Sequence, residues 1–535
     1  MFARIKRGGN KTHPHDYVQI VESYREAGKP KHRVVANLGR LDLLREGGSL
    51  DALTESLARL SRTLRVLSAV CGPRVDACRV RSWGPALVFG RLWEAQGLPA
   101  VIARLAEGRR FGFDLERAAF AMALQRLAAP GSDLQGSQWI ETIQAEGFEG
   151  LRLHHFYRTC GFLAEARLDL ERELFIRDRD LFHRELDLVF LDTTSTYVWR
   201  DTETELRKRG YSRDRRPDLP QMVLCVAVDR SGWPIAWEVF PGNTGDQEAF
   251  ARIVALLRER FSIRRVIVVA DRGMISKDAI RLLEDHAEAP FDYILGCRMR
   301  KDKEVSEQVL ARGGRFHPVA PNLEVKEVVV DDRRYVVCLN LDEANKDAAA
   351  RRALVEKLEA ALEHGPKSLI GNKGYARFLK AEKGAWRIDR KAIEADARLD
   401  GKYVLRTNTD LVAEEVALTY KSLWRVERTF REQKSTLQMR PIFHHRDDTS
   451  VGHIVASFLA LRLEVDLQRR LDEKGVEASW PDLMRDLAQV QAVQIVLDGR
   501  SYRVRTDLTG SAHAAFAATG VRPPDRIAPG EAGTA

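Results

Sequence analysis

The chain has 535 residues, of which 44% are hydrophobic and 30% are charged. No stretch approaches the roughly 20 uninterrupted apolar residues of a membrane helix, so this composition indicates a globular protein of several domains with no membrane partner. The 86 Lys and Arg residues exceed the 77 Asp and Glu residues, and the net charge is +9. This charge is compatible with a polyanionic partner, because cationic surface releases counterions from phosphates.

The N-terminal stretch MFARIKRGGNKTHPHDY is basic and is not followed by an apolar segment. We therefore expect no secretory signal and a cytoplasmic location. The cysteines form no C-x-x-C pair and have no histidine at zinc-binding spacing. Reduced, structural thiols are expected at all six positions: Cys71, Cys78, Cys160, Cys225, Cys297 and Cys338.

Residues 1–47 predict a basic β-hairpin, with one alternating run from Asp16 to Tyr24, a turn at Ala27-Gly28-Lys29-Pro30, and a returning run from His32 to Leu38. From 48 to 185 the apolar residues recur at helical spacing, which predicts a helical region. Such a region is a candidate for binding DNA ends through helix-turn-helix units. A packed helical domain without DNA contacts fits the same pattern equally well.

Residues 186–297 change to a strand pattern. Five short apolar or alternating runs are interrupted by two stretches of helical spacing, Gln247 to Arg258 and Ser276 to Glu284. Three strands, a helix, a strand, a helix and a fifth strand predict a mixed α/β sheet.

The rest of the chain predicts three further segments. Residues 298–409 combine strands with one charged helix and read as a β-rich insertion. Residues 410–472 contain a long helix beginning at Leu411 and a second, apolar helix. Residues 473–535 form a smaller C-terminal region, and its end, Pro523 to Ala535, is rich in Pro, Gly and Ala and predicts a disordered tail.

Two acidic residues follow apolar strands. Asp192 comes directly after Leu188 to Leu191, and Asp271 follows a second apolar run in VIVVADRGM. A buried acid within a strand is costly, so an acid at a strand's end is better placed to face a cleft. Two such acids on adjacent strands can share a metal ion, although each alone is also typical of an ordinary acid that caps a turn.

A third acid lies in the stretch YKSLWRVERTFREQK. Five of its residues recur at positions i, i+4, i+7, i+11 and i+14 and predict one stripe of a helix: Tyr420, Trp424, Glu427, Arg431 and Lys434. A carboxylate between an aromatic ring and two cations suits a surface that faces metal and phosphate. A solvated face with a Glu427–Arg431 pair explains the pattern equally well.

The same stretch resembles the YREK signature of bacterial insertion-sequence transposases of the DDE type, in insertion-sequence family four. Tyr420, Glu427 and Lys434 match its tyrosine, glutamate and lysine, whereas Leu423 stands at the arginine position and Arg425 follows two residues later. Further motifs resemble one branch of this superfamily: LDTTS around Asp192, GYSRDRRPDLPQ, PGNTGD, ADRGM around Asp271, and RTNTD.

The resemblance implies an α/β fold, with an RNase H-like catalytic core interrupted by the β-rich insertion and preceded by a mainly helical N-terminal region. It implies that Asp192, Asp271 and Glu427 are catalytic and hold Mg²⁺ or Mn²⁺, which suits hard oxygen ligands. The enzyme would cleave at the ends of its insertion sequence and join the 3′-OH ends to target DNA.

The implied partners are double-stranded DNA, as terminal inverted repeats and as target, and a second copy of the chain in a homodimeric synaptic complex near the bacterial nucleoid. DNA contacts are expected from the signature segment and from the basic run after Asp192: Tyr420, Arg425, Arg431, Lys434, Arg207, Arg209 and Arg213. A solvated charged loop is the ordinary alternative for the basic run. His444 and His445 are expected to be structural, because no ligand spacing supports a further metal site.

Two other functions fit the same residues. A metal-dependent endonuclease with the same fold would cleave DNA without joining strands. A catalytically silent DNA-binding protein derived from a transposase would bind without cleaving, although the presence of all three acids argues against it.

Overall fold

The computed structural model describes residues 2–10, 13–26, 29–46, 49–60, 76–182, 187–261, 267–284, 291–363, 377–382, 385–497 and 500–530. The chain divides into two compact units. The first unit comprises residues 1–84, 485–513 and 522–535, and the second comprises residues 85–484 and 514–521. Among the described residues, no helix is both long enough and apolar enough to cross a bilayer.

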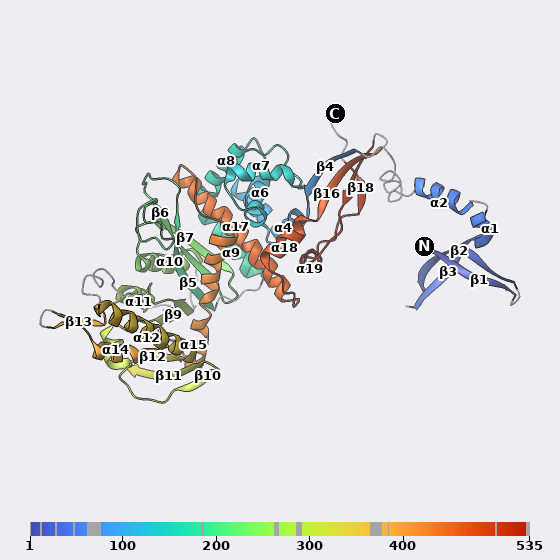
Figure 1. The fold of residues 1–535 in the computed structure, drawn as a ribbon. Helices are drawn as coiled ribbons and strands as arrows, with labels where there is room; N and C mark the ends of the chain where they lie inside the picture. The colour runs from blue at the N-terminus through green and yellow to red at the C-terminus, as the bar shows by residue number, and fades with distance from the viewer. Residues whose placement is uncertain are drawn as a thin grey trace. The chain divides into compact units, whose positions relative to one another are not determined.

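The first unit begins with an antiparallel three-stranded sheet in the order β1-β2-β3 (Figure 1). Its strands are β1 (Phe2–Asn10), β2 (His13–Glu26) and β3 (Lys29–Arg40), and the helices α1 (Leu41–Glu46) and α2 (Ser49–Leu60) follow. Strands β2 and β3 cover the two runs of the expected hairpin, and β1 is an additional strand. The expected turn residues Ala27 and Gly28 lie outside the described residues.

A second, four-stranded antiparallel sheet of this unit joins distant parts of the chain in the order β18-β17-β16-β4. Its strands are β4 (Asp76–Ser82), β16 (Gln491–Leu497), β17 (Arg500–Arg505) and β18 (Ile527–Pro529). Two expectations are wrong here. Strand β4 lies in the region expected to be helical, and β18 lies in the tail expected to be disordered. Both segments form strands because remote partners pair with them; residues 531–535 lie outside the description.

The second unit contains a group of helices built around α6, whose residues are almost all buried. Helix α6 packs against α8 and α17, and α17 is buried along most of its length, as expected of a core helix. The helices are α4 (Gly84–Ala95), α5 (Leu98–Leu105), α6 (Leu115–Ala128), α7 (Asp133–Trp139), the 3₁₀ turn η1 (Ile140–Thr142), α8 (Leu153–Glu165), α9 (Arg167–Phe182) and α17 (Asp447–Asp472). Helices α18 (Trp480–Ala488) and α19 (Ala512–Thr519) straddle the division between the units.

A nine-stranded mixed sheet forms the centre of the second unit, in the order β10-β11-β12-β15-β9-β8-β5-β6-β7. Strand β5 is parallel to β8, and β8 is parallel to β9, whereas the other neighbours are antiparallel. The strands and the two helices between them are β5 (Leu188–Tyr197), β6 (Gln221–Asp229), β7 (Pro234–Pro241), α10 (Asp246–Phe261), β8 (Ile267–Ala270), α11 (Lys277–Glu284) and β9 (Asp292–Gly296). The predicted mixed α/β architecture is confirmed.

The two faces of the sheet carry different helices. Residues of α10 and α11, such as Phe250 and Leu283, share a hydrophobic core with Leu191 on β5. The other face contacts α17, where Phe458 stacks on Trp237 of β7 with 4.5 Å between ring centroids. Side chains alternate along a strand, so Phe190 and Asp192 lie on the face opposite Leu191.

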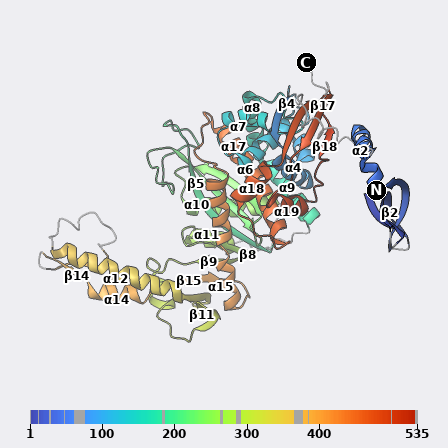
Figure 2. The same ribbon diagram turned by 45° about the vertical axis from the view of Figure 1, so that its right-hand side comes forward.

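The segment expected as an insertion extends this sheet. Strand β15 (Lys402–Thr407) pairs with β9. From β15 the sheet continues through β12 (Arg333–Asn340) and β11 (Leu323–Val330) to β10 (His317–Ala320). The remaining elements pack around Leu358 and Phe378, and Figure 2 shows the long α12 beside β14 and α14. They are α12 (Leu341–Glu363), β13 (Leu379–Glu382), β14 (Ala385–Ile388) and α14 (Arg390–Ala397). The π-helical turn η2 (Glu304–Val309) packs instead on β11 and β12, where Val305 and Val309 share a core with Val328 and Val337.

Candidate active site

The register of β5 and β8 brings two of the predicted acids together. The parallel pairs run from Leu188 and Ile267 to Leu191 and Ala270, so Asp192 and Asp271 are the next residues on strands about 4.8 Å apart. Asp271 follows the end of β8, as expected. Asp192, in contrast, lies inside its strand, because β5 continues to Tyr197 through its antiparallel pairing with β6.

Asp192 lies in an unfavourable environment for a negative charge, since its side chain is only 19% exposed. Burial raises its pKa to about 7, against the opposing effects of Arg213 and of the Thr193 backbone N–H, and the charges of Asp271 and Glu427 raise the pKa further. The charge of Glu427, the third predicted acid, therefore acts on Asp192. Carboxylate oxygens of this kind suit a hard divalent cation.

The helix that carries Glu427 is interrupted, which corrects the prediction of one continuous stripe. Helix α15 (Ala413–Lys421) ends before Ser422, α16 (Trp424–Arg431) begins after Leu423, and the π-helical turn η4 (Glu432–Thr436) follows. Hydrogen bonds between residues three positions apart, as in a 3₁₀ turn, tighten the junction; one of them runs from Leu423 N–H to Tyr420 O. Tight and wide turns change the angle between successive side chains, so the five residues do not share one face.

Helix α16 nevertheless contacts β5 and β6 and buries Val426 and Phe430. Glu427 is exposed on this helix, next to the sheet. Trp424, at 49% exposure, lies on the protein surface.

Tyr420 supports the second acid directly. Its hydroxyl donates a hydrogen bond to Asp271 Oδ1 at 2.9 Å, and burial raises its pKa, which keeps the hydroxyl protonated as a donor. Gly296 on β9 makes room for this contact, because a Cβ atom there would lie 2.5 Å from the Tyr420 hydroxyl oxygen. The tyrosine therefore orients an acid in this structure.

Lys434 pairs with a different acid, because its Nζ is 3.0 Å from Asp214 Oδ1. Asp214 is 5% exposed and is also paired with Arg440. The segment around Asp214, which is part of GYSRDRRPDLPQ, thus folds over the end of the signature stretch. Lys434 is close enough to Asp192 and Arg213 for their charges to affect its pKa.

Sequence reasoning missed a fourth carboxylate, Asp246, at the start of α10. Its Oδ1 accepts hydrogen bonds from Thr193 Oγ1 at 2.7 Å and from Arg213 Nη2 at 2.9 Å. Arg213 Nη1 is 3.8 Å from Asp192 Oδ1, so Arg213 links Asp246 to the first acid. A Cβ atom on Gly273 would lie 3.8 Å from Asp246 Oδ2 and 3.9 Å from Asp271 Oδ2. Asp246 is the last residue of the PGNTGD motif, which resembles a transposase motif, but nothing in the sequence indicated which residue of the motif reaches the site.

The other predicted DNA contacts have different surroundings. Arg207 is 1% exposed; its guanidinium forms an ion pair with Asp447 and donates hydrogen bonds to Ser450 Oγ and the backbone carbonyl of His445. The Arg207 side chain is therefore not accessible to DNA in this structure, contrary to expectation. Arg209 is 43% exposed and pairs with Asp201 and Glu203. Arg431 is exposed on α16.

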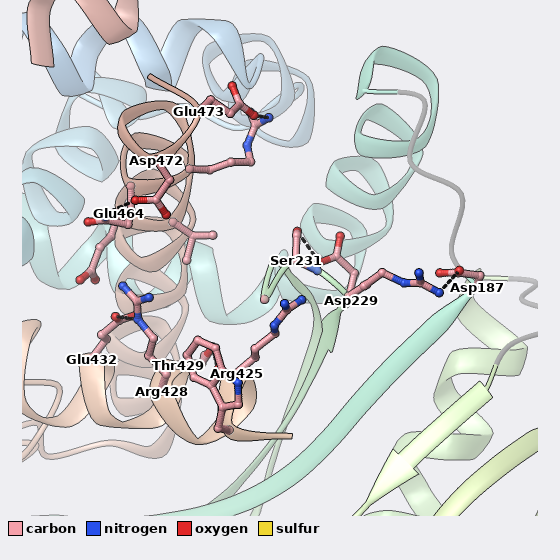
Figure 3. A pocket seen from close by; sticks show the side chains of 16 residues that line it. Asp187, Asp229, Ser231, Arg425, Arg428, Thr429, Glu432, Glu464, Asp472 and Glu473 are labelled. Atoms are coloured by element: carbon pink, nitrogen blue, oxygen red, sulfur yellow. Dashed lines mark hydrogen bonds and ion pairs between the residues drawn. The ribbon is translucent and has the colours of Figure 1, made fainter. Parts of the chain in front are cut away.

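Arg425 lies away from the acids, in a pocket of about 880 Å³ between α16, α17 and the turn after β6 (Figure 3). Its Cβ atom is 3.8 Å from the position that a Cβ would take on Gly232. Leu423, at the signature arginine position, is buried. Arg213, from a separate loop, pairs with Asp192, whereas Arg425 lines this pocket.

Comparison with known proteins gives two family matches. Residues 3–68 match the N-terminal domain of the IS1634 family transposases, and residues 183–463 match the transposase DDE domain. No curated protein matches the chain. A solved structure of the piggyBac transposase synaptic complex with hairpin DNA is similar at 11% identity over 76% of this chain and 79% of that chain, with a TM-score of 0.39, which is too low to bear on function. Because the DDE domain covers just over half of its length, the chain belongs to the DDE transposases of insertion sequences and is a DNA transposase.

Proposed function

We propose that this transposase cleaves DNA at the ends of its own insertion sequence and joins the 3′-OH ends to target DNA, with Asp192, Asp271 and Glu427 as the catalytic acids. The observation that supports this most strongly is the β5–β8 register, which makes Asp192 and Asp271 neighbours on parallel strands. The contact of α16 with β5 supports Glu427 as the third member.

The donor set supports two divalent ions, Mg²⁺ or Mn²⁺, as cofactors. Three carboxylates with hard oxygen atoms fit these ions, and the raised pKa of Asp192 indicates a site that gains from a nearby cation. Two such ions activate the attacking oxygen and neutralise charge on the phosphate. The chain's own contribution is orientation: Tyr420 fixes Asp271 by a hydrogen bond, and Thr193 and Asp246 hold Arg213 beside Asp192.

The finer fold assignment is part of this proposal. Strands β7-β6-β5-β8-β9, three antiparallel and then two parallel, support an RNase H-like core with parts at 186–297 and 410–472. Residues 298–409 would be the segment inserted between these parts. The spacing of Tyr420, Glu427 and Lys434 supports kinship with insertion-sequence family four.

The proposed partners are the terminal inverted repeats, target DNA and a second copy of the chain. The helical region at 48–185 is the candidate for binding DNA ends. Lys434, Arg431, Arg213 and Arg209 are the candidate phosphate contacts that remain near the acids or on the surface, and Tyr420 and Arg425 are less direct candidates because of the contacts described above.

The test is a cleavage and strand-transfer assay on duplexes that carry the element's own ends, with Mg²⁺. Asp192→Asn, Asp271→Asn and Glu427→Gln should each lower cleavage by at least about 100-fold and leave end binding intact. Glu414→Gln, an exposed acid on α15, is the matched control and should cleave normally. Normal cleavage by any of the three variants would refute the assignment.

The same assay separates the other functions. Cleavage by the wild type without joining would indicate an endonuclease. End binding without cleavage would indicate a silent DNA-binding protein.

A further inference from the structure

Three potential metal ligands from three segments meet in the helical part of the second unit. Asp133 is the first residue of α7, Cys160 is on α8, and His444 precedes α17. All three are buried, and one ligand atom of each lies within 4.8 Å of the other two. They are neither part of the acid cluster at the sheet nor close together in sequence.

The fold brings these segments together by specific contacts. A capping box between Ser132 and Gln135 fixes the start of α7 and hence the position of Asp133. Gly452 allows α17 to lie directly against α8, because a Cβ atom there would be 1.9 Å from the carbonyl oxygen of Cys160. This close approach carries His444, at the entrance to α17, toward Cys160.

Two of the three separations within the cluster match those of a tetrahedral ion. Asp133 Oδ2 is 3.3 Å from His444 Nε2 and 3.5 Å from Cys160 Sγ. Zinc bond lengths of about 2.0 Å to oxygen and nitrogen and about 2.3 Å to sulfur give separations of about 3.3 Å and about 3.5 Å at tetrahedral angles.

The other oxygen of Asp133 is held from outside the cluster. Arg126, 1% exposed, donates to Asp133 Oδ1 at 3.3 Å and to His453 Nδ1 at 2.9 Å. His453 therefore accepts at Nδ1 and donates from Nε2 to Met439 O at 3.2 Å. Metal-ligating carboxylates are commonly oriented by such an outer hydrogen bond. Arg126 thus leaves Oδ2 directed toward Cys160 and His444.

We propose that Asp133, Cys160 and His444 bind a zinc ion that is distinct from the ions of the transposition reaction. A thiolate and an imidazole with one carboxylate favour zinc over Mg²⁺ or Mn²⁺, which prefer oxygen ligands. Binding would release the thiol proton of Cys160 to solvent and leave the proton of His444 on Nδ1. The ion would tie the segment that follows the signature stretch to α7 and α8.

The first experiment measures metal content in the full-length wild-type protein after gel filtration in Mg²⁺ buffer. We expect about one zinc ion per chain by mass spectrometry. Cys160→Ser and His444→Ala should lose it, whereas Cys338→Ser, another buried cysteine, and His445→Ala, the exposed neighbouring histidine, should retain it. Zinc that remains in both ligand variants would overturn the assignment.

A second measurement does not depend on the folding of any variant. Wild-type protein in which Co²⁺ replaces the bound metal should show thiolate-to-cobalt charge transfer in the near ultraviolet and the visible bands of a tetrahedral site. Wild-type protein that contains no zinc and develops no cobalt–thiolate band would show that the cluster is a hydrogen-bonded network only. Neither measurement depends on transposition activity, so its result is independent of the function proposed above.

Discussion

Arg207 shows how a residue's surroundings determine its role. Its guanidinium is buried and bonds to Asp447, Ser450 and a backbone carbonyl. Arg207→Ala would remove one partner from each of these groups, and we expect the free energy of unfolding to fall by about 1–3 kcal/mol. Urea denaturation measures this loss. Arg209→Ala, which removes an exposed side chain two positions away, should change stability little; equal effects of the two substitutions would contradict a structural role for Arg207.

Glu464 predicts a specific pH dependence of stability. This residue lines the pocket of Figure 3, is 4% exposed, and has no hydrogen-bond partner for Oε2. Burial and the charge of Glu432 raise its pKa well above 4.5, against the effect of Arg428. The folded state therefore holds a proton that the unfolded state releases above pH 4.5, and this residue's contribution to stability falls as the pH rises through its folded pKa.

Glu464→Gln should remove the loss of stability that the Glu464 charge causes at high pH. We expect the variant to be more stable than the wild type at pH 8, by about 1–3 kcal/mol, and to differ less from it at pH 5. Urea midpoints at the two pH values measure the difference. Glu473→Gln, an exposed acid at the end of the same helix, is the control, and a Glu464→Gln variant less stable than the wild type at pH 8 would contradict the prediction.

At the scale of elements, two glycines test the packing of α17 on α8. Gly452→Ala places a methyl group 1.9 Å from the carbonyl oxygen of Cys160, so the helices must separate, and we expect a loss of about 1–3 kcal/mol. Gly161→Ala, on α8, meets nothing within 4 Å and should stabilise the helix by about 0.5–1 kcal/mol. Thermal unfolding of both variants measures the contrast; similar shifts in the same direction would show that the helices do not pack in this way.

The elements differ in how far the sequence predicts them. The first four residues of β5 and all of β8 are short apolar runs whose own pattern indicates a strand, so Asp192 and Asp271 could be placed next to strands. That β5 continues past Asp192 depends on its pairing with β6. Strands β4 and β18 depend on partners far along the chain, which a local pattern does not contain. The junction at Ser422 and Leu423 has no Gly or Pro to mark it. Asp246 was missed because its partners, Thr193 and Arg213, are 53 and 33 positions away.

At the scale of the whole molecule, two kinds of metal dependence should be separable. Removal of all divalent metal should abolish cleavage, because repulsion among the clustered acids and phosphate would no longer be neutralised. Mg²⁺ or Mn²⁺ added without zinc should restore cleavage to chains that retain their fold, while Ca²⁺ should support DNA binding alone. A cleavage assay with each ion tests this, and full cleavage in the presence of a chelator would refute the dependence.

The pairing of β4 with β16 has a consequence for synthesis. Ser82, at the end of β4, bonds to Ala488, 406 positions later, and β16 begins only at Gln491. The four-stranded sheet cannot form until the chain through β18 has left the ribosome. A product that terminates before β16 would retain all three acids but leave the edge of β4 unpaired, which favours aggregation or proteolysis. Truncated chains would thus be prone to aggregation or proteolysis before they encounter DNA.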